Sequence, residues 1–518
     1  MKNYQMLQNG SDIRGIAITG VEGELPNLTA DEAAHIAAGF LIWLSEKKEK
    51  APGEITVAIG RDPRVSGKSL LRGLTDGFGP YGVKILDCGL ASTPAMFMAT
   101  IMEGFKCDGS VMITASHLPY NRNGFKFFTE EGGLDKADIK EILSLARDED
   151  SWEKHLGRPS NENGYIMEMG RKTFPAREAD IMTPYCAHLR NIISRGAEKE
   201  GGIKNERPLE GLKIAVDAGN GGGGFFASRV LEPLGADISG SQFLTPDGTF
   251  PHHAPNPEDA EAMEALAMRV LSTGSDLGLM FDTDVDRSAA VDGRGRQIAR
   301  NGIVAMAAAI VSEDYPGSVV VTDSITSRQL TGFLQDRLGL EHHRFKRGYR
   351  NVINEGLRLN REGKKCGLAI ETSGHAAFLD NYFLDDGAYL AARIVVKAAV
   401  LKRQGRNIDS LIEALQEPAD EREVRIPVKA ADFASYGDMV LKELEEKVRK
   451  TPGLSLEEPN YEGVRVNFPE GWCLLRKSLH DPILPMNMAS DKEGGCEAIM
   501  ETMKEFLLRY TELDLTVL

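Results

Sequence analysis

Apolar positions near the start of the chain follow two different periods. In residues 29–44 they recur every three or four positions behind the capping-box pair Thr29 and Glu32, which predicts an amphipathic helix. Three short apolar runs follow, each ending in glycine or a small polar residue: ITVAIG, VKILDCG and SVMIT. Such runs, separated by helical stretches, predict the βα units of a doubly wound sheet.

The same alternation returns twice further along the chain. After a polar stretch at about 149–177, which we interpret as a connection, LKIAVDAGNGGGG and DLGLMFDTD predict strands of a second domain. SVVVT, a helical stretch at 326–338, LAIETSGH and a helix after Asp386 predict a third domain. From about Pro418 the strands VRIPV, GVRVNF and GWCLLRKS interleave with two long helices, which predicts an α+β domain.

The expected fold is therefore three doubly wound α/β domains followed by a C-terminal α+β domain. Their expected limits are 1–165, 166–300, 301–418 and 419–518. A chain of 518 residues is also too long for one hydrophobic core, so several domains are expected on length alone.

Composition narrows the class of protein. With 42% hydrophobic and 27% charged residues the chain resembles ordinary soluble proteins, and a net charge of -16 argues against binding to nucleic acid. The most apolar long segment, 389–401, is interrupted by Arg393 and Lys397, so no membrane span is expected. Six scattered cysteines, and a first motif too close to Met1 to leave room for a signal sequence, predict a cytoplasmic protein.

One candidate for chemistry is the serine in SVMITASHLPYNRNGFKFF. A strand ends directly before Thr114, which places Ser116 at a strand's carboxyl end, where it is open to reaction. Lys126, two residues after Gly124, can return a positive charge toward that serine. An ordinary serine in a turn is the alternative interpretation of this run.

A second candidate is the acidic run DTDVDR, in which Asp282, Asp284 and Asp286 alternate after an apolar strand. Three carboxylates converging there suit Mg²⁺, which prefers oxygen ligands. A calcium-binding EF-hand loop would need glycine and glutamate where Arg287 and Gly293 stand. Arg287 is placed to hold a phosphate, so this run and the serine run together suggest phosphoryl transfer.

Two later loops offer polar groups for a substrate. In ETSGH, Glu371, Ser373 and His375 follow an apolar strand, and a carboxylate with a hydroxyl suits neighbouring sugar hydroxyls. The loop RKSLHDP is a candidate phosphate site through four residues: Arg476, Lys477, Ser478 and His480. Taken singly, a structural loop and a solvated basic turn are the alternatives.

These motifs, in this order and spacing, resemble the α-D-phosphohexomutase superfamily. Further similar runs cover nearly the whole chain: GSDIRG, VAIGRDPRVSG, LASTPA, VDAGNGGGG and PDGTFPHHAPNPE. The resemblance implies four domains around a central cleft, which contribute in turn a phosphoserine loop, a metal-binding loop, a sugar-binding loop and a phosphate-binding loop.

The resemblance also implies roles for individual residues. Ser116 would carry the phosphoryl group and bind Mg²⁺ together with Asp282, Asp284 and Asp286. Lys126 and His375 would transfer protons. The remaining implied residues are Arg14 and Arg287, which line the active site, with His117 as a further catalytic candidate, Glu371 and Ser373 at the sugar, and Arg476, Lys477, Ser478 and His480 at the distal phosphate.

By the same resemblance, the enzyme would interconvert small hexose 1-phosphates and 6-phosphates of glucose, mannose or both. A monomer or homodimer is expected. A bisphosphorylated sugar would be the intermediate, with glucose 1,6-bisphosphate as the priming activator. The sequence departs from the family where Leu118 replaces asparagine and where SLHDP replaces SNTEP or SGTEP. Three alternatives stay open: a phosphoglucosamine mutase, a non-catalytic sugar-phosphate-binding protein and a phosphatase.

Overall fold

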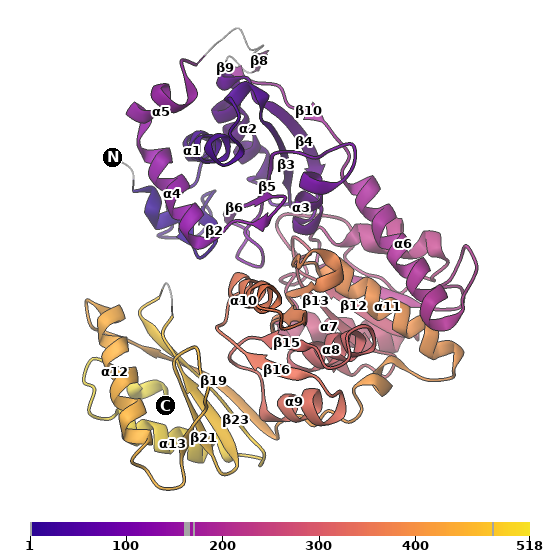
Figure 1. Ribbon diagram of the computed structural model, residues 1–518, viewed down its shortest axis with the longest axis vertical. Coiled ribbons are helices and arrows are strands. Elements are labelled where there is room, and N and C mark those ends of the chain that lie inside the picture. Colours follow the sequence, from indigo (N-terminus) through magenta and orange to yellow (C-terminus); the bar gives the residue numbers. More distant parts are fainter. Residues whose placement is uncertain (1–2, 160–165, 169–170, 479–480) are drawn as a thin grey trace. The chain divides into compact units, whose positions relative to one another are not determined.

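A computed structural model describes residues 3–159, 166–168, 171–478 and 481–518 (Figure 1). The chain forms two compact units, one of residues 1–303 with 373–410 and the other of residues 304–372 with 411–518. Within the described ranges, no helix has both the length and the apolar character needed to cross a membrane.

The first domain of the first unit is built on a mixed sheet in the order β1-β2-β6-β5-β3-β4-β10, with β7 beside β6. The pairs β3–β4, β3–β5 and β4–β10 are parallel, whereas β6 runs antiparallel to both β2 and β5. The strands are β1 (Gln8–Asn9), β2 (Asp12–Ile16), β3 (Thr56–Arg61), β4 (Lys84–Leu90), β5 (Gly109–Ile113), β6 (Arg122–Thr129), β7 (Gly132–Gly133) and β10 (Arg177–Glu178).

Side-chain alternation along these strands separates two faces of the sheet. Val57, Val111 and Phe127 belong to one core together with residues of three helices, α1 (Ala30–Lys48), α2 (Gly67–Phe78) and α4 (Lys136–Arg147). The other face carries α3 (Thr93–Ile101), because Ser110 of β5 donates to the Met96 carbonyl at 2.6 Å. Met112 of β5 pairs with Lys126 of β6, so strand parity places Lys126 on the α3 face.

The helix predicted at 29–44 is α1, and its Thr29–Glu32 capping box is confirmed. The prediction that this helix is amphipathic is wrong, because residues 36–44 are all buried. A Cβ on Gly39 would lie 2.4 Å from the Ile142 carbonyl of α4, and one on Gly73 of α2 would lie 2.2 Å from the Ala30 carbonyl. One glycine in each of these two contacts therefore lets α4 and α2 pack closely on α1. Together they cover a helix that the sequence pattern predicted to lie at the surface.

The second domain has a four-stranded sheet in the order β11-β12-β13-β14, parallel only between β11 and β12. The expected connection at 149–177 in fact contains a helix, α5, and the start of strand β10. The α-helices and strands of the first unit not yet given are α5 (Glu149–Leu156), β8 (Ile166–Glu168), β9 (Arg171–Thr173), α6 (Met182–Gly201), β11 (Ile214–Asp217), α7 (Ala260–Thr273), β12 (Leu277–Phe281), β13 (Ser288–Asp292), β14 (Gln297–Ile298), β18 (Ala376–Phe378) and α11 (Gly387–Arg403). Helix α8 (Asn301–Asp314) contains the boundary between the two units.

The second unit begins with parallel strands, β15 (Val319–Thr322) lying between β16 (Glu341–Arg344) and β17 (Cys366–Ile370). The helix expected at 326–338 is α9 (Arg328–Gly332), continued by a π-helical turn, and α10 (Tyr349–Arg361) precedes β17. The loops after β15 and β17 leave the same edge of the sheet, because parallel strands end at the same edge.

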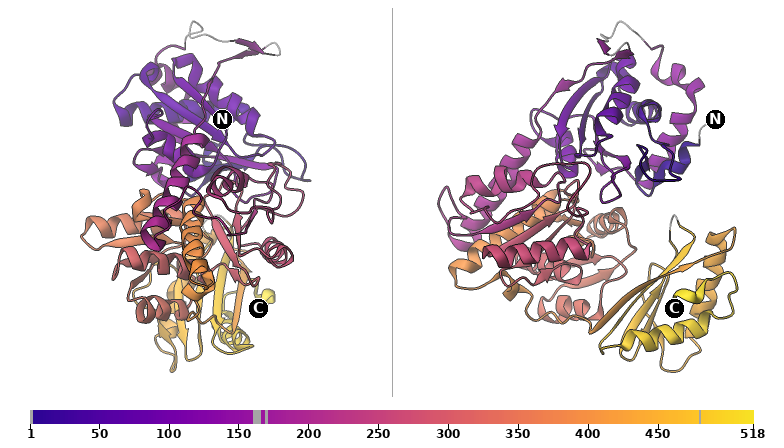
Figure 2. Two further views of the ribbon diagram at one scale, coloured as in Figure 1. Left: turned by 90° about the vertical axis from the view of Figure 1, so that its right-hand side faces the viewer. Right: turned by 180° about the vertical axis from the view of Figure 1, so that it is seen from behind.

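The C-terminal domain has an antiparallel sheet in the order β19-β23-β22-β21-β20. Helices α12 (Phe433–Val448) and α13 (Gly495–Leu507) share one core with this sheet, and Figure 2 shows both on one side of it. The strands are β19 (Asp420–Pro427), β20 (Ser455–Leu456), β21 (Val464–Phe468), β22 (Gly471–Leu475) and β23 (Ile483–Ser490). Strand β23 was not predicted from the sequence, and it pairs with β19 on one side and β22 on the other.

Candidate active site

Ser116 lies on the loop that joins β5 to β6. Its backbone has φ of 51°, a left-handed conformation that a residue with a side chain adopts only when surrounding contacts hold it. The Thr114 hydroxyl accepts from the Ser116 N–H at 2.9 Å, and Arg64 donates to the Ser116 carbonyl at 2.6 Å. The serine is 7% exposed. The loop is thus braced while its hydroxyl is kept within the interior of the first unit.

Three aspartates follow β12 and are almost completely buried: Asp282, Asp284 and Asp286. One carboxylate oxygen from each can be chosen so that all three lie within 4.8 Å of one another. The loop is held from two sides, because Thr93 donates to the Asp284 carbonyl at 2.8 Å and Gly222 donates to the Thr283 carbonyl at 2.8 Å. The three carboxylates of DTDVDR therefore converge in one compact cluster, as predicted, and we call residues 282–287 the metal loop for their expected role.

The cluster fits a divalent cation. Oδ1 of Asp284 and Oδ1 of Asp286 are buried and accept no hydrogen bond within the described part of the chain. Burial, followed by the charges of Asp286 and Asp284, raises the pKa of Asp282 well above its usual value. Carboxylates that repel one another in a buried site are stabilised by a shared cation, and hard oxygen ligands suit Mg²⁺.

Arg287 connects the serine loop to the metal loop. Its guanidinium donates to Ser116 Oγ at 3.1 Å and to Asp282 at 3.1 Å through Nε, and it also donates to Asn256 Oδ1 at 3.0 Å. Ser116 Oγ itself donates to Asp282 Oδ2 at 3.2 Å. The serine hydroxyl therefore lies between a carboxylate of the acidic cluster and an arginine.

Lys126 supplies a second positive charge. Its ammonium forms a close contact with Asp286 and lies 3.2 Å from Asp284. Although burial alone raises the pKa of Asp286, the charges of Lys126, His375 and Arg287 lower it below the usual value. Lys126 and Asp286 are 160 positions apart in the sequence, so only the tertiary structure brings them together.

Arg14 and His117 lie against the same serine loop. Arg14 donates to the Thr114 carbonyl and pairs with Asp12 at 2.7 Å. Exposed His117 has its Nδ1 3.3 Å from Ser116 Oγ. Both residues are thus close to the serine, Arg14 through the backbone of its loop and His117 through the hydroxyl.

His375 and Ser373 approach the metal loop from the segment that precedes β18. The Ser373 hydroxyl and His375 Nδ1 are 2.8 Å apart. His375 Nε2 lies 3.6 Å from Asp286 and 3.8 Å from Asp385, and Asp286, His375 and Asp385 form a second group with metal-ligand spacing. Asp385 was not predicted from the sequence, because it belongs to none of the motifs singled out there.

The second unit positions Glu371 at the end of β17. The Gly348 N–H donates to Glu371 at 2.6 Å, and the Thr372 hydroxyl donates to Asp323 at 2.7 Å. Burial and the charge of Glu371 raise the pKa of Asp323 to about 7. The loop that begins with Glu371 is therefore held by the loops after β15 and β16, and neither of these was predicted to take part.

The described residues of the candidate phosphate loop have different partners. Burial, followed by the positive charge of Arg347, lowers the pKa of Arg476 below its usual value. Lys477 instead pairs with Asp438 of α12 at 2.5 Å, and Ser478 Oγ accepts from the Asp481 N–H at 3.2 Å. His480 lies outside the described residues. Arg347 was missed, although the basic run FKRGYR with its central glycine was a signal that was available.

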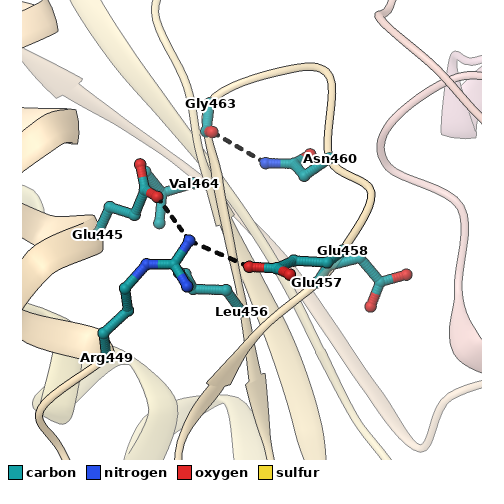
Figure 3. A pocket seen from close by; sticks show the side chains of 8 residues that line it. All are labelled: Glu445, Arg449, Leu456, Glu457, Glu458, Asn460, Gly463 and Val464. Atoms are coloured by element: carbon teal, nitrogen blue, oxygen red, sulfur yellow. Dashed lines mark hydrogen bonds and ion pairs between the residues drawn. The ribbon is translucent and has the colours of Figure 1, made fainter.

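A separate pocket in the C-terminal domain contains none of these residues (Figure 3). Arg449, which lines this pocket, forms ion pairs with Glu445 at 2.9 Å and Glu458 at 3.0 Å. Glu457 contributes a third carboxylate to the lining. An acidic lining of this kind repels a phosphate, so this pocket is not part of the candidate site.

The chain is similar to known proteins over most of its length. Three family models match in succession, described as phosphoglucomutase/phosphomannomutase alpha/beta/alpha domain I (residues 5–152), domain II (184–295) and domain III (300–418). The chain is 30% identical over 491 residues to a phosphoglucomutase of Neisseria meningitidis, covering 94% of each chain. It is 28% identical over 502 residues to a phosphomannomutase/phosphoglucomutase of Pseudomonas aeruginosa, covering 96% of this chain and 95% of that protein.

A solved structure is similar in fold. It is a phosphoglucomutase/phosphomannomutase family protein from Burkholderia thailandensis, with a TM-score of 0.75 at 24% identity over 97% of each chain. The family models and this likeness confirm the predicted fold class, with three α/β domains followed by a C-terminal domain of sheet and helices.

Proposed function

Because this chain belongs to the phosphoglucomutase/phosphomannomutase family, it is a phosphohexomutase, and we propose that Ser116 carries the phosphoryl group that it transfers. The observation that supports this role most directly is the position of Ser116 Oγ, 3.1 Å from Arg287 and 3.2 Å from Asp282. An arginine can offset charge on a transferring phosphoryl group, and a fixed position supplies much of the remaining rate enhancement.

In the proposed first half-reaction, a sugar hydroxyl attacks the phosphorus of phosphorylated Ser116. The bond from phosphorus to the serine oxygen breaks, a bond from phosphorus to the sugar oxygen forms, the hydroxyl proton passes to a base, and the serine oxygen takes up a proton to become a hydroxyl again. The second half-reaction reverses these changes at the other end of the bisphosphorylated sugar. We assign the proton transfers to His375 and Lys126, because both lie against the acidic cluster beside Ser116.

The metal would be held by Asp282, Asp284 and Asp286 together with an oxygen of the phosphorylated serine. Mg²⁺, when bound there, would neutralise charge on the phosphoryl oxygens. Arg14 holds the serine loop through Thr114, and His117 lies beside the hydroxyl. Glucose 1,6-bisphosphate is proposed as the primer because the serine must be phosphorylated before the first turnover.

We propose glucose and mannose phosphates as substrates, in agreement with the names of the relatives, and Glu371 and Ser373 as partners of the sugar hydroxyls. Arg476, Ser478 and His480 are proposed for the distal phosphate. Lys477 is the weakest member of that set, because Asp438 already pairs with it.

The domain limits, the central cleft and the monomeric or dimeric state stay predictions. All six cysteines are buried and free, which supports the proposed cytoplasmic location.

The proposal is tested by following phosphorus NMR with Mg²⁺ and a trace of glucose 1,6-bisphosphate. Glucose 1-phosphate, mannose 1-phosphate and glucosamine 1-phosphate are supplied separately. Conversion of glucose and mannose 1-phosphates to 6-phosphates, abolished in Ser116→Ala, is the expected result. Preference for the glucosamine compound would move the assignment to a phosphoglucosamine mutase. Activity retained by Ser116→Ala would remove Ser116 from the mechanism.

A further inference from the structure

Arg64 has no role in the proposed chemistry, yet its side chain is completely buried beside the serine loop. A guanidinium has five N–H donors, and all five of Arg64 are engaged. Nε donates to Asp62 at 3.2 Å. The four remaining bonds go to backbone carbonyls: Pro119 at 2.6 Å and Arg122 at 3.1 Å from Nη1, and Ser116 at 2.6 Å and Leu118 at 2.6 Å from Nη2.

All four carbonyls belong to the segment 116–122, the loop that carries Ser116. The loop has little regular structure of its own, and Ser116 is held in a strained left-handed conformation. Buried carbonyls without partners would add further cost. One planar, rigid group therefore satisfies four acceptors and fixes their spacing, which the flexible chain of a lysine does not do.

Arg64 is supported by contacts from its own domain and from the second domain. Asp62 accepts from the backbone N–H of Arg64 at 2.9 Å as well as from Nε, so it orients the arginine and offsets its charge. The guanidinium carbon also lies 5.1 Å from the ring centre of Phe250 in the second domain. Because every donor is engaged, none is left to contact a substrate phosphate.

We infer that Arg64 is a positioning residue, which holds the Ser116 loop so that Oγ faces Asp282 and Arg287 and is directed to the sugar rather than to water. The inference rests on the proposed role of Ser116 as carrier of the phosphoryl group. It extends that role to the backbone of the loop, and it explains how Leu118 is accommodated, since the loop is held there by a carbonyl rather than by a side chain.

The decisive variant is Arg64→Lys, which keeps the charge but loses the planar fork. Arg61→Lys is the matched control, because Arg61 lies at the end of β3 and its side chain pairs with Asp87 at 3.2 Å, away from the segment 116–122. Folding is checked by circular dichroism and thermal unfolding. The kinetic constants are measured together with the fraction of phosphoryl groups released as inorganic phosphate instead of returned to sugar.

We expect kcat of Arg64→Lys to fall roughly 10- to 100-fold, as misplacement of a reacting group by about 1 Å does. KM should stay within about twofold, because no donor of Arg64 touches substrate. The fraction released as inorganic phosphate should rise, whereas Arg61→Lys should match the wild type in all three quantities. A general loss of stability would lower the active fraction but would leave that partition unchanged.

Wild-type kcat and partition in a folded Arg64→Lys would overturn the inference, and so would a raised KM with unchanged kcat, which would show that Arg64 binds substrate. If Arg64→Lys does not fold, Asp62→Asn decides by the same measurements, since it weakens the orientation of Arg64 while leaving the guanidinium in place. Ser116→Ala separates the two proposals: an active Ser116→Ala contradicts the phosphoserine, whereas an inactive one with a wild-type-like Arg64→Lys contradicts only the role of Arg64.

Discussion

At the scale of single residues, Asp284 shows how the acidic cluster is prepared for a cation. Oδ2 accepts from the Thr93 hydroxyl at 2.5 Å and lies 3.2 Å from Lys126, while Oδ1 is buried without a hydrogen-bond partner within the described residues. The side chain is therefore fixed in place by one oxygen and presents the other to a ligand.

Asp284→Asn should consequently abolish the stabilisation by Mg²⁺. We expect Mg²⁺ to raise the Tm of the wild type, because a ligand that binds only the folded state stabilises it. The variant should show little or no shift, and its activity should fall by about 100-fold or more. Asp276→Asn is the control, since Asp276 lies outside the cluster and pairs with Lys402. An equal Mg²⁺ shift in Asp284→Asn would place the metal elsewhere.

His253 and Asp217 form a buried ion pair near the loop that carries Asn256, with Nε2 3.1 Å from Oδ2. Burial disfavours the charged imidazole, but the hydrogen bond and charge of Asp217 outweigh it and raise the pKa of His253 above its usual value. A histidine whose pKa is raised by folding stabilises the protein fully at pH values below its usual pKa of about 6.5. This stabilisation is lost as the pH rises through the pKa of the folded state.

His253→Gln should therefore reduce the free energy of unfolding more at about pH 6 than at about pH 9. Urea unfolding of both proteins at the two pH values measures this. A loss that is the same at both pH values would show that the histidine stabilises the loop by packing alone.

At the scale of elements, the segment before β18 packs closely against the start of β13. Gly374 has φ of 93°, and a Cβ there would lie 2.5 Å from the Ser288 carbonyl. The Ser288 N–H donates to the Gly374 carbonyl at 3.3 Å, and Arg287 and His375 form an isolated bridge. This close approach is what brings His375 to the metal loop.

Gly374→Ala should lower the free energy of unfolding by about 2–4 kcal/mol and reduce kcat, because strain and a backbone clash both displace His375. Gly405→Ala is a matched control: Gly405 has φ of 70°, but a Cβ added there would meet nothing within 4 Å. It should cost only about 1 kcal/mol and leave activity unchanged. Equal effects of the two substitutions on kcat would mean that the approach to β13 does not position His375.

At the scale of the whole molecule, the two units depend on different interactions. Ser116 and the three aspartates all belong to the first unit. In the second, buried Arg465 of β21 donates to the Ser324 carbonyl at 2.8 Å and the Thr326 carbonyl at 3.0 Å, and stacks 3.7 Å from the ring centre of Trp472. One arginine thus ties the C-terminal sheet to the loop after β15.

Unfolding should accordingly proceed in more than one step, because chains with several compact units depart from two-state behaviour. Mg²⁺ should protect the amides of the first unit against hydrogen exchange in urea, whereas Arg465→Met should expose those of the second. Mass spectrometry of peptides from each unit measures both effects. If unfolding is a single transition, and if Mg²⁺ and Arg465→Met each shift its midpoint equally for peptides of both units, the units unfold together.

Much of the local structure follows from the sequence alone. The cap at Thr29, the strands before Ser116 and Asp282, and the spacing of the three aspartates are set by neighbours a few positions apart, which periodicity and capping rules describe. Those signals also sufficed for the fold class and for most residues of the candidate site, including Arg287 beside Ser116.

Only the tertiary structure decided which distant groups meet. Lys126 reaches Asp286, Asp385 joins His375, and Lys477 turns to Asp438 because packing of whole elements brings them together, and no local pattern carries that information. The same holds for Arg64, whose donors find four carbonyls more than fifty positions away. Short-range periodicity records which face of an element is buried, but the partner that covers that face is selected by the packing of the complete domain.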